Sequence, residues 1–557
     1  MVTCSGCGSA ATSWSPRATR WVPLLVLTPL VLVLGRSIAI DDTLFLGAAE
    51  QILKDPWRPF DAVTPSGTTP LPLWIALKNP PGLAYWLAAG LAVAGHEEWW
   101  LHLMLLPFAL AAALAGVRLG RRFLGEADAA TWATAAWLAS PAFLVSASTL
   151  TADVPALALV LWATALWIDG VDGDRAAARR LGAALVGLAL VVKYTAVLVL
   201  PLLALYVVLQ APRERRAPMG LDLWPAFSPS LAWALVGLAT HGRMHVVDSL
   251  WIVDASWLVT WRKALLEHGI ALLTCVAAAG VFPVVLLVPA LGRSIRGSAI
   301  AVVAGALGLG AAHVVPSTWR QAPAAVPVAA GVLVALGAAA VLAAGGALLE
   351  RRDPGVVFVA VWFGLWALFV WGWSWTVAAR FVLPLLPPLA WLLALAAGPA
   401  RRWLLPAASA ASLAVSAVVI QADMFPVAFH RAVVDELAGQ AAPTGQRVYF
   451  VGGGTVLYYG ERVGMRWLDP DDRTARAGDL LLHPYWSANS LLPQRFRSRI
   501  ALVTRLTAPV PPLGIHTMNP AAGAGFYASA WGPLPFAIAS LPAGGANVWR
   551  ITADPAP

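Results

Sequence analysis

Charged residues are scarce in this chain. Only 12% of its 557 residues are Asp, Glu, Lys or Arg, whereas 59% are hydrophobic and the mean hydropathy is +0.71. A soluble chain of this length would carry a much more polar surface, so the composition excludes that class. Apolar stretches near the roughly 20 residues needed to cross a bilayer recur from Trp21 to Ile420. The sequence therefore predicts an all-α polytopic membrane protein.

Cysteine is also rare, and the common nucleotide motifs are missing. The Cys4-x-x-Cys7 pair has no second half to complete a metal site, so we assign it neither zinc nor a disulfide. Gly452-Gly453-Gly454 lacks the spacing of a dinucleotide fingerprint and is interpreted as a turn. The net charge of +9 comes from small arginine groups at intervals, not from one basic stripe. We interpret these groups as topology signals and expect no nucleic-acid partner.

Membrane spans were placed with apolar windows of about 19 residues. The basic clusters between these windows, from Arg17/Arg20 to Arg401/Arg402, then fall on alternate loops. This alternation predicts a cytoplasmic N-terminus and an outer C-terminus, because Lys and Arg are retained inside. It makes Pro80–Gly95 a juxtamembrane or re-entrant helix on the outer side, and Leu181–Leu209 a hairpin with Lys193 at its outer end. About thirteen spans result, at residues 21–40, 99–118, 130–148, 154–168, 181–193, 196–210, 224–241, 268–290, 298–315, 325–348, 355–373, 381–399 and 403–422.

Three regions follow from this topology. They are a cytoplasmic tail at 1–20, a transmembrane domain at 21–424 with a long first outer loop at 41–98, and an extracytoplasmic α/β domain at 425–557. Long loops between spans tend to be functional. In the last region the hydropathy falls, and the pattern predicts one amphipathic helix and several short strands. They lie at Val427–Leu437, Arg447–Val451, Asp479–Leu482 and Ile500–Thr504.

Two adjacent carboxylates, Asp41 and Asp42, stand where the first span leaves the membrane. Charge is costly at that depth, which points to a reacting centre, although the pair could also be a solvated helix cap. The topology places further ionisable residues on the same outer face: Lys78, Asp153, Lys193, Arg243, His245, Asp248, Arg262, Lys263, Arg320 and Arg380. A carboxylate can accept the proton of a polar acceptor, and cations can stabilise a phosphate leaving group. Such a set suits a reaction between a polar acceptor and a membrane-held phosphate ester.

Structural roles remain open for several of these residues. Lys78 precedes a proline turn and could be an interfacial lysine whose amine reaches water. Asp153 stands two residues before Pro155 and could be a helix N-cap. Arg380 faces the side opposite to the topology arginines, which favours a function for it.

The order of these motifs resembles the polytopic glycosyltransferases called GT-C, in particular the protein O-mannosyltransferase and lipid A aminoarabinose transferase families. The resemblance covers roughly residues 20–400. Its matching segments are Asp41-Asp42, Phe45–Glu50, Lys78–Leu87, Thr151–Pro155, the Lys193 hairpin and Ala379–Pro384. Two departures stand out: the acidic pair is Asp-Asp where the family more often has Asp-Glu, and Asn79 separates the lysine from the double proline.

The resemblance implies that the sugar donor is a polyprenyl phosphate entering from the bilayer. Asp41 is then the general base or acceptor-orienting residue, with Asp42 as its partner. Candidates for binding the donor phosphate are Lys78, Arg380, Lys193 and Arg320, and candidates for the acceptor or sugar are Asp153 and Tyr85. No cofactor is assigned. A divalent metal cation is left open, with Asp41, His245 and Asp248 as the candidate ligands.

The predicted function is a membrane glycosyltransferase of the cell envelope that acts on the outer side of the inner membrane. It would move a hexose or pentose from the lipid-linked donor to a lipid, glycan or protein acceptor, with inversion by a single displacement. A lipid-linked sugar transporter or flippase is the alternative. Transporters place their ionisable residues near the bilayer midplane in repeated halves, whereas here the charges cluster on one side and no repeat is visible. A non-catalytic scaffold would leave the acidic pair and Lys78 unexplained.

Overall fold

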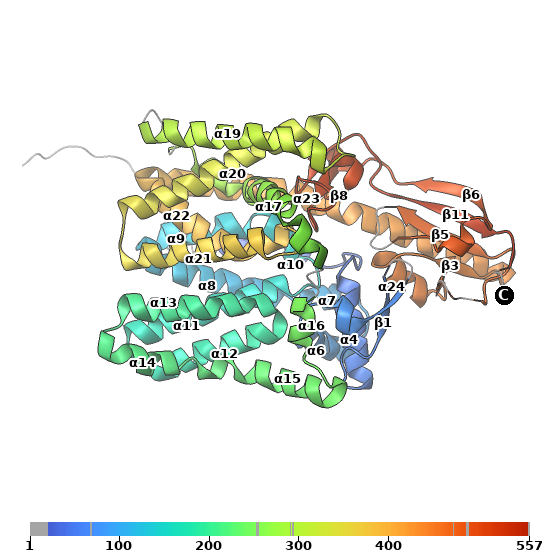
Figure 1. The fold of residues 1–557 in the computed structure, drawn as a ribbon, viewed down its shortest axis with the longest axis horizontal. Coiled ribbons are helices and arrows are strands. Elements are labelled where there is room, and N and C mark those ends of the chain that lie inside the picture. The colour runs from blue at the N-terminus through green and yellow to red at the C-terminus, as the bar shows by residue number, and fades with distance from the viewer. Residues whose placement is uncertain are drawn as a thin grey trace, which may run out of the picture.

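The computed structural model describes residues 21–66, 69–251, 255–289, 291, 295–469, 471, 473–485 and 490–554, without the side chains of residues 66 and 250–263. The Cys4/Cys7 pair and the side chains of Arg262 and Lys263 lie outside this described set. Helices run side by side through most of the molecule, and the strands gather at one end of it (Figure 1). The prediction of a mainly helical protein is confirmed.

The first half of the chain forms short and medium helices. They are α2 (Val22–Val26), α3 (Thr28–Leu32), α4 (Asp42–Lys54), α5 (Leu73–Ala76), α6 (Gly82–Ala94), α7 (Glu98–Leu103), α8 (Leu106–Leu124), α9 (Ala127–Leu138), α10 (Pro141–Ala147), α11 (Asp153–Asp172), α12 (Ala176–Val192), the 3-10 helix η1 (Tyr194–Leu198), α13 (Val199–Gln210), α14 (Arg213–Leu221), η2 (Trp224–Ala226), α15 (Ser228–His241) and α16 (His245–Trp251). A hairpin of β1 (Val63–Ser66) and β2 (Thr69–Pro72) interrupts them.

The second half contains the longest helices. They are α17 (Ala255–Thr274), the π-helix η3 (Cys275–Ala279), α18 (Phe282–Leu286), α19 (Ile295–Thr318), α20 (Ala325–Glu350), α21 (Pro354–Gly372), the 3-10 helix η4 (Ala379–Leu385), α22 (Leu386–Ala396), η5 (Gly398–Ala400) and α23 (Arg401–Ala441). Figure 1 shows α23 leaving the helical body and running into the part of the molecule that holds the strands.

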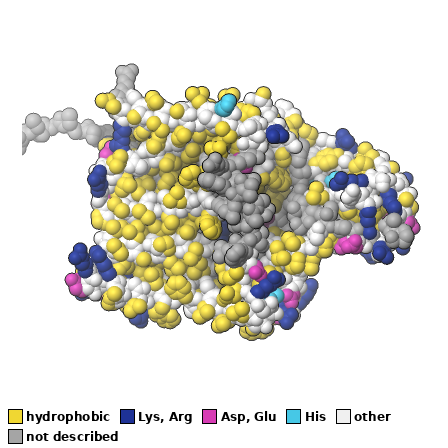
Figure 2. All heavy atoms as spheres, viewed as in Figure 1, with side chains coloured by type: hydrophobic (Ala, Val, Ile, Leu, Met, Phe, Trp, Pro, Cys, Tyr) yellow, Lys and Arg dark blue, Asp and Glu magenta, His cyan; other side chains and the backbone are white. Residues whose placement is uncertain are grey.

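Seven helices among the described residues are long and apolar enough to cross a membrane, or eight if Arg213–Ala226 and Ser228–His241 form one bent span. They show an integral, multi-pass protein. On the face drawn in Figure 2, apolar side chains cover the helical body, and Lys and Arg gather at its left edge and on the strand-bearing part. The predicted number of thirteen is not reached by this criterion.

Proline explains part of that difference. All thirteen predicted windows fall on helices, but several windows contain two short helices in place of one long helix. Proline lacks the backbone N–H that a helix interior needs, so it tends to begin a new helix. Pro29, Pro141 and Pro283 each stand in the first turn of a short helix, in α3, α10 and α18.

Arginine–carboxylate pairs lie at one end of the helical body. Asp169 and Asp172, at the end of α11, pair with Arg118 and Arg122 of α8. Asp153 begins α11 and contacts Lys193 at the end of α12, so these two residues mark the opposite end. Lys193 thus stands at the end of the α12–α13 hairpin, where the sequence places it.

The C-terminal part contains a five-stranded sheet with the order β4-β3-β5-β11-β6. Its strands are β3 (Val448–Phe450), β4 (Arg466–Trp467), β5 (Leu480–Tyr485), β6 (Ile500–Thr507) and β11 (Gly545–Ile551), with α24 (Thr455–Arg462) between β3 and β4. β3 is parallel to β4 and β5, and β11 is antiparallel to β5 and β6. Smaller two-stranded ladders pair β7 (Ile515–His516) with β10 (Ala537–Ile538), and β8 (Met518–Asn519) with β9 (Ala524–Gly525). The predicted amphipathic helix is not separate, because α23 continues through Pro426.

The two largest of four buried apolar clusters among the described residues position the site. The larger one fills the helical body and includes Trp137, Trp167 and Trp391, each fully buried. The second joins residues 41–98 to the C-terminal part, since Phe45 of α4 and Phe450 of β3 belong to the same buried cluster. Burial of apolar surface therefore couples residues 41–98 to the sheet.

Candidate active site

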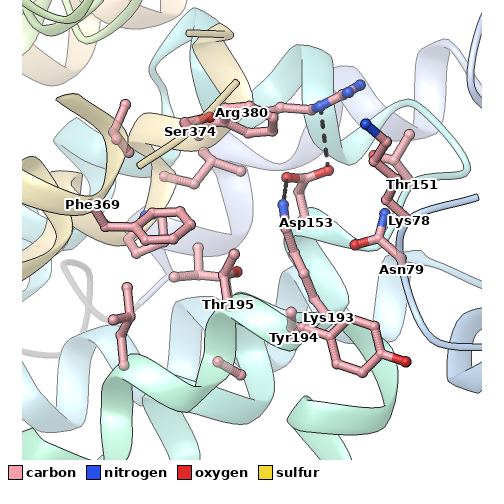
Figure 3. A pocket seen from close by; sticks show the side chains of 18 of the residues that line it. Lys78, Asn79, Thr151, Asp153, Lys193, Tyr194, Thr195, Phe369, Ser374 and Arg380 are labelled. Carbon is pink, nitrogen blue, oxygen red and sulfur yellow. Dashed lines mark hydrogen bonds and ion pairs between the residues drawn. The ribbon is translucent and has the colours of Figure 1, made fainter. Parts of the chain in front are cut away.

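A cavity of about 730 Å³ lies at the end of the helical body that carries Asp153 and Lys193. One part of its wall is polar and includes Asp41, Lys78, Asn79, Thr151, Asp153, Lys193, Thr195, Ser374 and Arg380. The other part is apolar and comes mainly from α11, η1 and α21, with Leu157, Val160, Val197, Leu198, Leu365, Trp366, Leu368, Phe369 and Val370. Figure 3 shows the cationic side chains of Lys193 and Arg380 converging on Asp153.

Four charged residues form a chain of contacts along the polar wall. Arg380 Nη2 lies 2.7 Å from Asp41 Oδ2, and Arg380 Nε lies 3.8 Å from Asp153 Oδ2. The other oxygen of Asp153 accepts a hydrogen bond from Lys193 Nζ. Asp41 precedes α4, Asp153 begins α11, Lys193 follows α12 and Arg380 belongs to η4. Segments that are distant in sequence thus meet at one place.

Arg380 has unused hydrogen-bonding capacity. Its side chain is 15% exposed, and its buried Nη1 atom has no hydrogen-bond partner among the described residues. A buried donor without a partner is costly, and Arg380 lines the cavity, so its guanidinium is suited to binding an acceptor oxygen there. The planar guanidinium matches the oxygens of a phosphate in particular.

Lys78 is a second cation of the cavity wall. It lines the cavity and forms no ion pair with a described carboxylate, and its Nζ lies 5.4 Å from the ring centre of Trp375. Partial burial lowers the pKa of its amine, because the charged form loses hydration. An anion bound beside Lys78 would restore that lost stabilisation.

The two adjacent carboxylates point to different places. Asp41 lines the cavity, whereas the carboxylate of Asp42 is buried outside it and accepts hydrogen bonds from the backbone N–H groups of Ala39, at 3.0 Å, and Leu150, at 2.8 Å. Burial raises the pKa of Asp42 to about 6, against the lowering effect of Arg36 and of these two hydrogen bonds. Asp42 therefore holds the turn in which Asp41 stands.

Besides Asp42, the predicted site residues Tyr85, Arg320, His245 and Asp248 lie away from the cavity wall. Tyr85 donates a hydrogen bond to the carbonyl oxygen of Pro56. Arg320 is exposed in the connection between α19 and α20. His245 contacts the hydroxyl of Tyr194 and the carbonyl oxygen of Trp74.

The candidate metal ligands do not assemble into a metal site. Asp248 accepts a hydrogen bond from Trp74 Nε1 and pairs with Arg243, while Asp41 pairs with Arg380. Among the described residues, no three His, Cys, Asp or Glu side chains are grouped so that they could hold a metal ion. The structure therefore does not bring Asp41, His245 and Asp248 together as ligands of one cation.

Sequence reasoning missed part of the cavity wall. Ser374 and Trp375 follow α21, and Trp375 stands beside Lys78. Aromatic residues at a helix end are typical of the membrane interface, so the sequence gave no reason to assign them to a site. The apolar face of α21 could not be distinguished from a lipid-facing surface for the same reason.

One family model matches part of the chain. Residues 78–233 match the family model described as dolichyl-phosphate-mannose-protein mannosyltransferase. The predicted resemblance is confirmed. The matched segment contains Lys78, Asp153 and Lys193, whereas Asp41 and Arg380 lie outside it. Among curated protein sequences, none matches the chain.

Several solved structures are similar to the chain at low sequence identity. ArnT from Cupriavidus metallidurans in the apo state is 17% identical, with 84% of this chain and 93% of that chain covered and a TM-score of 0.42. The oligosaccharyltransferase of Archaeoglobus fulgidus is 13% identical over 80% of this chain and 62% of that chain, with a TM-score of 0.45. The arabinofuranosyltransferase AftD from Mycobacteria is 14% identical, with 98% and 40% covered and a TM-score of 0.41.

Proposed function

We propose that the protein is a membrane glycosyltransferase that moves a sugar from a polyprenyl-phosphate donor to an acceptor of the cell envelope. The observation that carries the proposal is the composition of the cavity wall. A partly exposed carboxylate, Asp41, and two cations with free capacity, Lys78 and Arg380, stand beside an apolar face of α21. A lipid-linked phosphate combines an anionic group, which the two cations can bind, with a hydrocarbon chain, which the apolar face of α21 can bind. The family description matched by residues 78–233, which names a dolichyl-phosphate sugar, supports the same donor class.

The donor would bind along both parts of the wall. Its hydrocarbon chain would lie against α21 and η1, where Leu368 and Val197 are exposed. Its phosphate would lie between Lys78 and the unpartnered Nη1 of Arg380. Lys193 is neutralised by Asp153, so we assign it to holding Asp153 and Arg380 in place, with any contact to phosphate secondary.

The reaction would be a single displacement. The acceptor nucleophile attacks the anomeric carbon and gives its proton to Asp41, while the bond from that carbon to the phosphate oxygen breaks. The electron pair of the broken bond remains on the released polyprenyl phosphate, whose added charge Lys78 and Arg380 stabilise. Attack opposite to the leaving group inverts the anomeric configuration. The ion pair with Arg380 holds the carboxylate of Asp41 at the cavity wall, where it can accept the proton of the acceptor.

Lysine and arginine side chains of the protein would stabilise the negative charge that develops on the phosphate. Lys78 and Arg380 both line the cavity and would supply the positive charge that stabilises a phosphate leaving group. We therefore assign no metal to the site and derive no step through one.

We also propose the predicted topology, with thirteen spans, a cytoplasmic tail at 1–20, a transmembrane domain at 21–424 and an outer α/β domain at 425–557. The segregation of charges supports it: arginine–carboxylate pairs of α8 and α11 lie at one end of the body and the cavity at the other. The acceptor would be a lipid, glycan or protein of the envelope, and the sugar a hexose or a pentose.

Transfer assays test the function directly. Purified protein in nanodiscs would be incubated with labelled polyprenyl-phosphate mannose or arabinose and with envelope extracts, and both free polyprenyl phosphate and new glycosides would be measured. The proposal expects the two products in equal amounts. Movement of intact donor across a vesicle membrane, with no glycosidic bond formed, would establish the flippase alternative in its place.

A further inference from the structure

The backbone segment that carries Asp41 is strained. Ile40 has a φ of +33°, which is rare for a residue branched at Cβ. Such a conformation persists only when the surrounding structure holds it. The hydrogen bonds of Asp42 to Ala39 and Leu150 hold the segment from the side of the helical body.

The C-terminal part holds the same segment from the other side. The hydroxyl of Tyr459, on α24, accepts a hydrogen bond of 3.0 Å from the backbone N–H of Ile38 and donates one to Glu98. Glu98 is fixed in turn by Arg431 of α23, at 2.9 Å. Figure 1 shows α24 at the junction between the strand-bearing part and the helical body.

Gly454 gives the turn room at this junction. It adopts a φ of +63° and a ψ of −135°, a conformation that residues with a Cβ rarely adopt. A Cβ at Gly454 would lie 3.4 Å from both the N and the Cα of Ile40, so the two unusual backbone conformations face each other. The glycine run that has no nucleotide-binding spacing thus packs against the segment of Asp41.

A second contact of the C-terminal part holds the segment of Arg380. The backbone N–H of Ala379 donates to the carbonyl oxygen of Phe526 at 2.8 Å, and Ser529 N–H donates to the carbonyl oxygen of Val377 at 2.7 Å. The hydroxyl of Ser529 also accepts the N–H of Val377 at 3.1 Å. Residues 526–529 therefore pair with the extended backbone directly before Arg380.

A buried ionic cluster connects the two contacts. Arg36, before the strained turn, pairs with Asp423 of α23 at 2.6 Å. Asp423 accepts a further hydrogen bond of 2.6 Å from Tyr527, which lies between Phe526 and Ser529. Both residues of the pair are almost completely buried, so this cluster is well placed to be rigid.

We propose that Tyr459 and Ser529 are positioning residues for the Asp41–Arg380 pair. Tyr459 fixes the strained turn that aims Asp41 at the cavity, and Ser529 fixes the backbone that presents Arg380 to it. The kinetic consequence rests on the proposed glycosyl transfer, whereas the bracing of the two segments does not. The C-terminal part is thereby a component of the active site, although neither residue lines the cavity.

Tyr459→Phe and Ser529→Ala test the proposal, with Tyr458→Phe as the matched control. Tyr458 stands next to Tyr459 on α24, but its side chain contacts His96 and Arg462 and not the turn before Asp41. We expect kcat for transfer from a polyprenyl-phosphate sugar to fall about tenfold in each test variant, because a small misplacement of reacting groups slows the chemical step. KM for the donor should stay within about twofold, since neither side chain touches the cavity. The control should match the wild type.

Hydrogen exchange of the intact protein in detergent provides a readout that does not depend on activity. Peptides covering residues 36–44 should exchange about tenfold faster in Tyr459→Phe, and peptides covering 374–382 about tenfold faster in Ser529→Ala, at an unchanged melting temperature. Wild-type protein without transferase activity would refute the proposed function. The exchange rates would still show whether Tyr459 and Ser529 hold the segments of Asp41 and Arg380 in place. Unchanged exchange together with wild-type kcat, or equal effects from Tyr458→Phe, would overturn the inference.

Discussion

Arg380 and Asp41 form an ion pair of 2.7 Å between a 3-10 helix that follows α21 and the turn that begins α4. The pair joins the only carboxylate of the acidic doublet that reaches the cavity to a guanidinium with a free donor. It places both groups on one wall of the cavity. The first two predictions address its two members separately.

Asp41→Asn should lower the transfer rate by a factor of about 100 or more. Asparagine keeps the shape of the side chain but cannot accept a proton, and general-base catalysis contributes factors of this order. Initial rates with labelled donor in nanodiscs measure the effect. Asp61→Asn is the control, because Asp61 pairs with Arg58 and His241 and does not line the cavity. Near-normal transfer by Asp41→Asn would show that another group accepts the proton.

Arg380→Lys should lower kcat by about 10- to 100-fold despite keeping the charge. A lysine has no planar fork, so it cannot contact Asp41 and an anion at the same time as the guanidinium does. Arg320→Lys is the matched control, since Arg320 is exposed and outside the cavity wall. We expect wild-type kinetics for the control. Equal losses in the two variants would contradict the placement of the phosphate at Arg380.

Lys78→Met should raise KM for the lipid-linked donor by about tenfold or more, because a charge-assisted contact to phosphate contributes about 1.5–3 kcal/mol. Methionine preserves much of the apolar stem that lies near Trp375. Lys54→Met, at the exposed end of α4, is the control. Binding of labelled polyprenyl phosphate to each variant measures the same loss without turnover, and unchanged binding would place the phosphate elsewhere.

Asp42→Asn should change how stability depends on pH. Burial raises the pKa of Asp42 to about 6, so the folded protein holds this proton more tightly than the unfolded chain. The unfolding free energy of the wild type therefore falls as pH rises from about 4 to about 6, by about 3 kcal/mol from this residue. Asparagine is neutral at every pH, so the Asp42→Asn variant lacks this pH-dependent change in the unfolding free energy.

Thermal unfolding in detergent between pH 4 and pH 7 measures this difference. The stability of the wild type relative to Asp42→Asn should decrease over the interval and stay constant above it. A constant offset between the wild type and Asp42→Asn at every pH would contradict the raised pKa.

Much of the cavity could be predicted from the sequence because the positive-inside rule sorts charges between the two ends of the helices. Asp153 and Lys193 were placed at one end by this rule, and the structure brings them into contact. The hairpin that carries Lys193 followed from basic residues on both sides of one apolar stretch. The roles of these residues stay predictions, but their proximity is a property of the fold.

The sequence could not show which of the residues predicted on one side of the membrane line the cavity. The predicted topology places both Arg320 and Arg380 on the outer face, yet only Arg380 follows a helix that lines the cavity. Asp41 and Asp42 are adjacent, and their directions depend on the strained φ of Ile40. That conformation is held by Tyr459, far away in the chain, and no local pattern around Ile40 reveals it.

The pairing of residues 526–529 with the backbone before Arg380 also bears on the order in which the protein is assembled. The helices that supply Asp41, Lys78, Asp153 and Lys193 are synthesised long before Phe526. Until the later segment has docked, Val377 and Ala379 lack their hydrogen-bond partners. Catalytic competence would therefore be acquired late in biosynthesis, after membrane insertion, which keeps a half-made chain from consuming lipid-linked sugar.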